Sequence, residues 1–163
     1  MLHYCRERFM TKHFTVTAIL VTKDTPKKVL LGFHRKLGAW LPPGGHIELD
    51  ETPIEAVIRE TREEAGLDIS SYLPINTLDE RVTSSPTPAY FFEETIPRYG
   101  KDPEHIHLDF VYVINGFPET VLTVQTDEMK DMHWFTKEQI FDDPENFPTY
   151  PNLREKILRD IFA

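Results

Sequence analysis

The segment 45–67 constrains the fold most, because its local chemistry fixes both ends of a helix. Thr52 is a favoured N-cap residue, and Glu55, three positions later, can complete a capping box. Pro53 takes the first helical position, where its missing N–H leaves no hydrogen bond unmade. Gly66 can adopt the left-handed conformation that ends many helices. We therefore predict one helix between Thr52 and Gly66.

Two nearly opposed stripes run along this helix when it is plotted at about 100° per residue. One stripe is suited to packing inward and consists of Ile54, Val57, Ile58, Thr61 and Ala65. The other brings three carboxylates within roughly 5–6 Å at their Cβ atoms, those of Glu60, Glu63 and Glu64. A hard divalent cation such as Mg²⁺ or Mn²⁺ would relieve their repulsion by binding the oxygens. The alternative is a solvated acidic helix face.

The spacing of the whole segment resembles the signature of the Nudix hydrolases, G-x5-E-x7-R-E-U-x-E-E-x-G-U, in which U is an aliphatic residue. The chain matches this signature at Gly45, Glu51, Arg59, Glu60, Glu63, Glu64, Gly66 and Leu67. It departs at Thr61, whose methyl group can still pack inward. The resemblance extends upstream through 40–46 and downstream to 133–135, so it covers most of the chain.

The resemblance implies a pyrophosphohydrolase, which splits the diphosphate bond of a nucleoside diphosphate linked to another moiety. Mg²⁺ or Mn²⁺ would assist the attack of water, since phosphoryl chemistry needs positioning and charge neutralisation more than covalent help. By the same resemblance, Glu60 and Glu64 are the leading metal ligands, and Glu63 is a further ligand or an orienting group. One of these carboxylates, or one from outside the helix, would deprotonate the water.

Arg59 and Glu128 are the other two candidate catalytic residues. On the helical wheel, Arg59 falls to the side of the acidic stripe, where it can pair with Glu55 or Glu63 and hold the geometry of the cluster. The resemblance implies the same role for Arg59 together with Glu51. The alternative is an ordinary surface ion pair worth under ~1 kcal/mol.

Glu128 precedes Trp134 at a distance where members of the family often place an additional carboxylate. It is equally typical of a solvated loop acid. Asp127, Glu93 and Glu94 compete with it for the same role. The sequence therefore favours Glu128 without excluding these three.

Two prolines and two glycines at 42–45 predict a loop directly ahead of the helix. Such a loop would aim backbone amides at a group above the helix, so Gly44 and Gly45 are candidate phosphate contacts. His46 could also reach a phosphate, or its ring could be satisfied by backbone. Arg35, beside Lys36, is the nearest cationic candidate for a terminal phosphate. A plain tight turn and ordinary hairpin charges are the alternatives.

His105, His107 and Asp109 alternate along one predicted strand and therefore share a face. Three interpretations stay open for this array. It could be a second metal site, a set of substrate ligands, or simply the polar side of a half-buried strand, which alternation alone predicts.

Patterns of β-branched and apolar residues predict a mixed sheet with helices on both faces, an α/β sandwich in one domain over 1–163. The expected strands are 14–22, 29–34, 76–83, 90–94, 105–115, 121–125 and 132–135. The first two should form a hairpin. Further helices are expected from Thr136 and over 152–162, where an apolar stripe recurs at helical spacing.

Composition limits the function classes. The net charge of −9 and the absence of a basic patch argue against a nucleic-acid duplex as partner. No apolar stretch approaches the ~20 residues that span a bilayer, and no signal peptide is evident, so a cytoplasmic protein without membrane contact is expected. Cys5, the single cysteine, permits no internal disulfide.

Two functions from other classes are alternatives to hydrolysis. A non-catalytic nucleotide-binding or regulatory module of the same fold would not need the complete acidic set. A diphosphate isomerase of that fold would need a catalytic cysteine beside the loop, and Cys5 is distant in sequence. The sequence therefore predicts a small-molecule diphosphate substrate and a hydrolase.

Overall fold

The computed structural model describes residues 10–122 and 128–163. The strands of the main sheet are β1 (Lys12–Thr22), β2 (Lys28–His34), β3 (Ala39–Leu41), β4 (Gly44–His46), β7 (Tyr90–Ile96), β8 (His105–Phe117) and β9 (Met129–Thr136). A separate two-stranded sheet contains β5 (Asn76–Thr77) and β6 (Thr83–Ser84). The helical elements are α1 (Pro53–Ala65), η1 (Ser70–Tyr72), α2 (Lys137–Phe141), η2 (Leu153–Leu158) and α3 (Arg159–Ile161).

Strand β1 is the centre of the main sheet and determines where the other strands lie. It pairs in parallel with β8 along almost its whole length, and β7 lies antiparallel on the far side of β8. The other edge of β1 is shared by two strands. β2 pairs near one end, at Val21↔Val29, and β4 pairs near the other end, at Thr15↔His46. β2 therefore diverges to pair with β3 and β9, and β4 lies beside the first half of β1.

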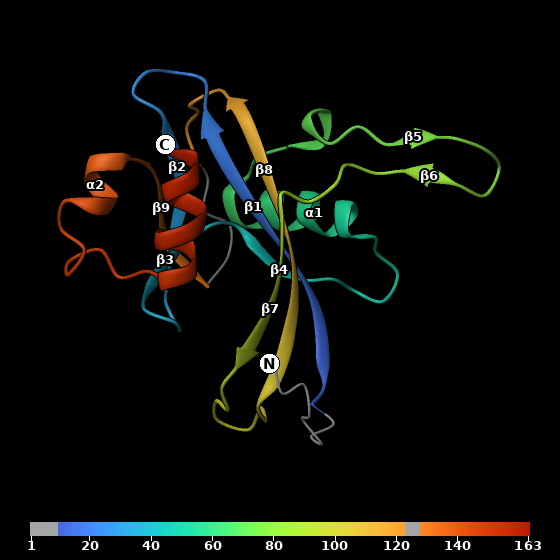
Figure 1. Cartoon of the computed structure of the whole chain (residues 1–163), viewed down its shortest axis with the longest axis horizontal. Coiled ribbons are helices and arrows are strands. Elements are labelled where there is room, and N and C mark those ends of the chain that lie inside the picture. The colour runs from blue at the N-terminus through green and yellow to red at the C-terminus, as the bar shows by residue number, and fades with distance from the viewer. Residues whose placement is uncertain (1–9, 123–127) are drawn as a thin grey trace, which may run out of the picture.

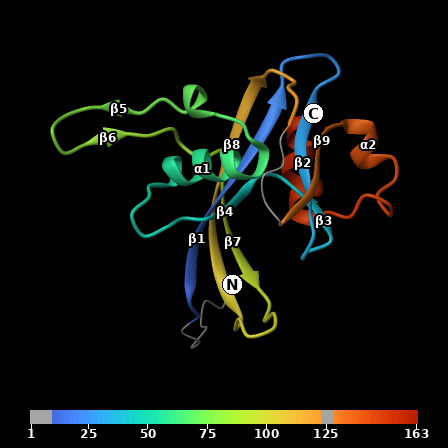
Figure 2. The same cartoon turned by 180° about the vertical axis from the view of Figure 1, so that it is seen from behind.

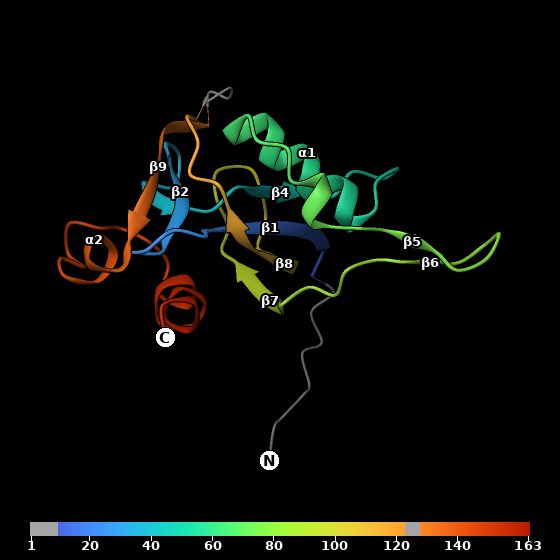
Figure 3. The same ribbon diagram turned by 90° about the horizontal axis from the view of Figure 1, so that it is seen from above.

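Helices cover both faces of this mixed sheet, as Figures 1 and 3 show. α1 lies over one face, across β1 and β8 in Figure 2, where its apolar stripe joins a cluster that includes Val16, Leu20 and Tyr112. The continuous C-terminal helix formed by η2 and α3 packs on the opposite face, against a cluster that includes Ile19 and Val111. The predicted sandwich is therefore confirmed.

The local predictions agree with the structure for most elements, including the first hairpin, whose pairing is limited to one end of β1. α2 begins after Thr136, whose side chain forms a capping box with Gln139. The strand expected over 76–83 is wrong. β5 and β6 form a hairpin in that region, with Asp79 accepting hydrogen bonds from the backbone amides of Arg81 and Val82.

Two other boundaries differ from expectation. The loop predicted over 42–45 is shorter, because Gly44 and Gly45 belong to β4 and pair with β1. In the strand expected over 121–125, residues 123–125 lie outside the described residues, and Val121 and Leu122 are not in a strand. No helix in the described ranges has the length and apolar character needed to cross a membrane.

Candidate active site

Both ends of α1 form as the sequence predicts. The backbone amide of Thr52 donates to Glu55 Oε2 at 2.8 Å, and the amide of Glu55 donates to Thr52 Oγ1 at 3.3 Å. Gly66 has φ 71° and donates its N–H to the carbonyl of Arg62. Glu55 is therefore committed to the capping box, and its expected alternative pairing with Arg59 is not found.

The inward stripe of α1 packs against the sheet, with Ile54, Val57 and Ala65 almost fully buried. Thr61, the departure from the family pattern, is fully buried as well. Its hydroxyl donates to the carbonyl of Val57 at 2.7 Å, so the buried hydroxyl of this threonine is not left without a hydrogen bond. The signature departure is accommodated within the helix.

The three glutamates differ in exposure, which the helical wheel does not predict. The side chain of Glu63 is 54% exposed and that of Glu60 is 15% exposed. Glu64 is buried, with only 4% of its surface exposed. The solvated acidic face is therefore a wrong description for Glu64, because β4 lies against this part of α1 and the backbone N–H of Gly44 donates to Glu64 Oε2 at 3.0 Å.

Gly44 and Gly45 allow β4 to come this close. A Cβ atom at Gly45 would fall inside van der Waals contact with the carboxylate of Glu60, and one at Gly44 would collide with the backbone of β1 at Val16. Glycine is therefore required at both positions by close approach. One of the predicted amides, that of Gly44, does aim at the helix, where it is used by Glu64.

Arg59 connects β4 and the loop before α1 to the acidic cluster. Its guanidinium donates to both oxygens of Glu51, to Glu60 Oε1 at 2.8 Å and to Glu63 Oε2 at 3.3 Å. It also donates to the carbonyl of His46 at 3.0 Å. Hydrogen bonds from Arg59 lower the pKa of Glu51. This arrangement is the one that an orienting role requires.

Burial sets the electrostatics of the other two carboxylates. It raises the pKa of Glu60, and the hydrogen bond from Arg59 opposes this shift. Burial raises the pKa of Glu64 to about 8, although the Gly44 amide opposes the shift, and the charge of Glu60 adds to it. Among the described residues, no lysine or arginine forms an ion pair with Glu64. A buried carboxylate beside further carboxylates offers only oxygen atoms as metal ligands, which suits a hard divalent cation.

Of the candidate residues outside α1, Glu128 and Arg35 are neighbours, and Glu94 lies elsewhere. Glu128 is 74% exposed, approaches His34 at 3.9 Å, and is close enough for its charge to raise the pKa of Glu64. The backbone carbonyl of Glu128 accepts from the amide of Arg35 at 2.8 Å, so these two candidates are neighbours. The competitor Glu94 lies elsewhere, on β7, and accepts from Asn152 Nδ2 at 2.6 Å.

The remaining competitors are less well placed or are not described. Glu93 is exposed on β7, opposite Leu108 in the register. Asp127 lies outside the described residues. Of the three described carboxylates, Glu128 is the one whose charge raises the pKa of Glu64 on the helix.

The His105-His107-Asp109 array divides into two parts. Asp109 is buried and accepts from the hydroxyls of Thr15 at 2.8 Å and Thr17 at 2.9 Å. His105 and His107 instead lie beside His13. His13 was missed by the sequence reasoning, because only the parallel pairing of β1 with β8 brings it there.

Comparisons with known proteins show the family and the fold. The model of the NUDIX domain family matches residues 11–157. A NUDIX-family hydrolase from Clostridium perfringens has 28% sequence identity and a TM-score of 0.63, over 93% of this chain and 98% of that chain.

Two further relatives are matched over less than half of their own length. A bifunctional NMN adenylyltransferase/ADP ribose pyrophosphatase from Francisella tularensis, solved with AMP and a Mn ion, has 19% identity and a TM-score of 0.59, over 95% of this chain and 43% of that chain. This likeness shows a shared fold. The m7GpppN-mRNA hydrolase NUDT17 of Xenopus laevis is 47% identical over 55 residues, which are 31% of this chain and 18% of that relative.

Proposed function

The chain belongs to the Nudix family and is a hydrolase acting on a pyrophosphate bond, and we propose that its substrate is a nucleoside diphosphate linked to another moiety. The observation that carries the proposal is the acidic cluster of α1. Glu64 is buried against the Gly44 amide, while Arg59 joins Glu60 and Glu63 to Glu51. A charged cluster held this firmly beside a strand is suited to binding phosphate through a cation.

We assign the metal-binding role to Glu60, Glu63 and Glu64. Their oxygens are the ligand type that Mg²⁺ or Mn²⁺ prefers. A divalent cation bound there would neutralise charge on the phosphate oxygens and lower the pKa of a bound water. Arg59 keeps Glu60 in place from one side, and the Gly44 amide fixes Glu64 from the other.

Glu128 is the candidate for accepting the proton of the attacking water. Its side chain is largely exposed, and among the described residues its one ion-pair partner is His34, at 3.9 Å. A carboxylate that is free to reorient can approach a water above α1, whereas Glu94 is bonded to Asn152. Geometry is the first requirement for a general base, and Glu128 meets it best.

The substrate phosphates would lie between α1 and the turn that follows β2. Arg35 is exposed at that turn and is held beside Glu128 through its backbone amide. Its side chain is the cation we assign to a terminal phosphate.

The Gly45 backbone lies beside Glu60 of α1, and we include it as a candidate substrate contact. The ring of His46 lies beside those of His13 and His107 on the other face of β4, so we do not assign it to the substrate. Gly44 acts indirectly, through Glu64.

A panel of substrates tests the proposal. Metal-free protein would be incubated with ADP-ribose, a dinucleoside polyphosphate and capped RNA, each with Mg²⁺, with Mn²⁺ and without metal. Products would be identified by mass spectrometry in ¹⁸O-labelled water, which marks the phosphorus atom that is attacked. We expect metal-dependent cleavage of at least one nucleoside diphosphate compound. Cleavage restricted to non-nucleotide diphosphates would contradict the proposed substrate class.

The same panel separates hydrolysis from the two other classes. A regulatory module would bind a nucleotide without releasing product, and an isomerase would rearrange a diphosphate without incorporating ¹⁸O. Glu55→Gln is the matched control for the active-site variants, because glutamine at this position can also complete the capping box.

A further inference from the structure

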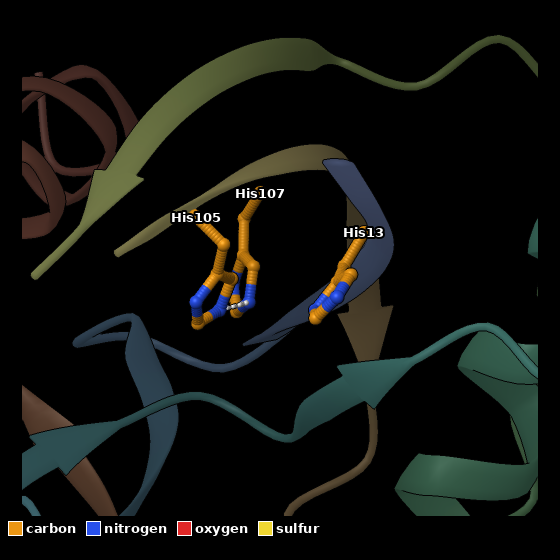
Figure 4. A group of neighbouring side chains, drawn as sticks. All are labelled: His13, His105 and His107. Carbon is orange, nitrogen blue, oxygen red and sulfur yellow. Dashed lines mark hydrogen bonds between the residues drawn. The ribbon is translucent and has the colours of Figure 1, made fainter. Parts of the chain in front are cut away.

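Three imidazoles from two strands converge at one end of the sheet. His13 comes from β1, and His105 and His107 come from β8 (Figure 4). Each contributes a ring nitrogen, and these three nitrogens all lie within 4.8 Å of one another. The ring of His46, on β4, adjoins this group, with its centroid 5.3 Å from that of His13 and 5.0 Å from that of His107.

This histidine cluster is separate from the acidic cluster of α1. His13 and His107 are partners in the parallel register of β1 and β8, so their side chains share one face of the sheet. His46 is the partner of Thr15, on that same face. Gly45, next to His46, faces the carboxylate of Glu60 instead. Because side chains alternate along a strand, the histidines and the glutamates lie on opposite faces of β4.

The hydrogen bonds of these rings place their nitrogens close together, and His105 Nε2 and His107 Nε2 share one hydrogen bond of 3.0 Å (Figure 4) that a metal ion would replace. His105 Nδ1 lies 2.9 Å from the carbonyl of Pro103, which requires Nδ1 to be the donor and leaves Nε2 as an acceptor in the neutral ring. Backbone carbonyls orient many metal-binding histidines in this way. His13 Nδ1 is buried and has no hydrogen-bond partner within the described part of the chain. A buried polar atom left unpaired is uncommon and calls for a ligand or another explanation.

We propose that His13, His105 and His107 form a binding site for a divalent transition metal such as Zn²⁺. Imidazole nitrogen suits Zn²⁺, Ni²⁺ or Cu²⁺, whereas Mg²⁺ and Mn²⁺ prefer oxygen. The two clusters therefore select different metals. The inference goes beyond the proposed hydrolysis and does not depend on it.

The spacing of two of the nitrogens already fits a metal. His105 Nε2 and His107 Nε2 are 3.0 Å apart. Two Zn–N bonds of about 2.1 Å place their nitrogens about 3.0 Å apart at a right angle and about 3.4 Å apart at the tetrahedral angle. The observed separation equals the right-angle value, so a tetrahedral metal would move the two nitrogens slightly apart. The third nitrogen, from His13, lies within 4.8 Å of the other two and must come closer to share one ion with them.

The charge state of the cluster also favours a metal ligand over a proton. Burial, reinforced by His46, His105 and His13, lowers the pKa of His107 to about 4. Burial and the neighbouring His13 lower the pKa of His46. Within the described residues, none of the three proposed ligands forms an ion pair with a carboxylate. Three protein ligands leave a fourth position of a tetrahedral metal, which water or His46 could take.

Such a metal would join the beginning of β1 to the beginning of β8, where each strand enters the sheet. Isothermal titration calorimetry would measure Zn²⁺ binding to metal-free protein in excess Mg²⁺, which occupies oxygen sites. We expect one Zn²⁺ per chain and a rise in Tm on binding, since a ligand that binds only the folded state stabilises it. His107→Asn and His13→Asn should each weaken binding at least about tenfold.

Matched variants locate the site. His133→Asn removes an exposed histidine on β9 and should bind Zn²⁺ like the parent, as should Glu60→Gln. X-ray absorption of the Zn²⁺-loaded parent should show at least three imidazole ligands. This measurement uses the parent protein alone, so it does not depend on whether any variant folds. Absence of Zn²⁺ binding by the parent, equal affinity in His107→Asn, or a shell made of oxygen ligands would overturn the proposal.

Discussion

Arg59 holds both carboxylate oxygens of Glu51, with Nε 2.6 Å from Oε1 and Nη2 2.8 Å from Oε2. This bidentate pair fixes the plane of the guanidinium, whose remaining N–H groups reach Glu60 and the carbonyl of His46. One side chain thus sets the distance between α1 and β4. The acidic cluster depends on that distance, because β4 also supplies the Gly44 amide that binds Glu64.

Replacing Arg59 by lysine should lower kcat at least about tenfold and raise the Mg²⁺ concentration needed for half-maximal activity. Lysine keeps the charge but cannot bind a carboxylate through two parallel hydrogen bonds, so Glu60 loses its fixed position. Steady-state kinetics over a range of Mg²⁺ concentrations would measure both effects. Arg62→Lys is the control, because Arg62 forms an exposed pair with Asp68. Kinetics equal to the parent would exclude an orienting role for Arg59.

Glu64→Gln should reduce kcat at least about a hundredfold, since the metal loses a charged ligand where it must neutralise phosphate. The fold should remain intact. Glutamine can still accept from the Gly44 amide. Burial raises the pKa of Glu64 to about 8, so the parent must bind a proton to keep this carboxyl buried at neutral pH, a cost that glutamine does not have. Tm of the metal-free variant should therefore equal or exceed that of the parent. Calorimetry would measure Tm, and steady-state kinetics would measure kcat. Activity near that of the parent would remove Glu64 from the mechanism, provided that Glu55→Gln is also active.

Local chemistry made part of this site predictable. The helix caps and the inward-facing stripe depend only on residues of one helix, so they can be predicted from the local sequence. They include Thr52, Gly66 and Val57. Arg59 and Glu51 are eight positions apart and were paired only through the family resemblance. The structure confirms that pair. Helix geometry alone suggested Glu55 or Glu63, and of these two the structure pairs Arg59 with Glu63.

The tertiary contacts were not predictable in the same way. A helical wheel places Glu64 on an acidic stripe but does not show that β4 covers this part of the stripe. His13 is far from His105 in sequence, and nothing local indicates that β1 and β8 pair in parallel. The single strand predicted over 76–83 is wrong for a local reason. Its β-forming residues belong to a hairpin whose turn contains Asp79.

Gly45→Ala should impair activity more than stability. The added Cβ would collide with the carboxylate of Glu60, which is the end of a flexible side chain and can move away. Glu60 would then lose its position relative to Arg59 and the metal, so we expect kcat to fall and the Mg²⁺ requirement to rise. Gly100→Asn, at a left-handed position with open space around it, is the control. An alanine variant with unchanged metal dependence would show that the close approach has no catalytic importance.

Glu128→Gln should reduce kcat far more than substrate affinity, because a general base acts as charge develops in the transition state. Stability should hardly change, since this side chain is 74% exposed. Glu94→Gln provides the comparison: Glu94 is bonded to Asn152, and glutamine can keep that contact. Both variants would be measured for kcat, KM and Tm with the same substrate. Should Glu128→Gln match the parent in kcat while Glu94→Gln does not, the role of general base would pass to Glu94 and the loop assignment would be wrong.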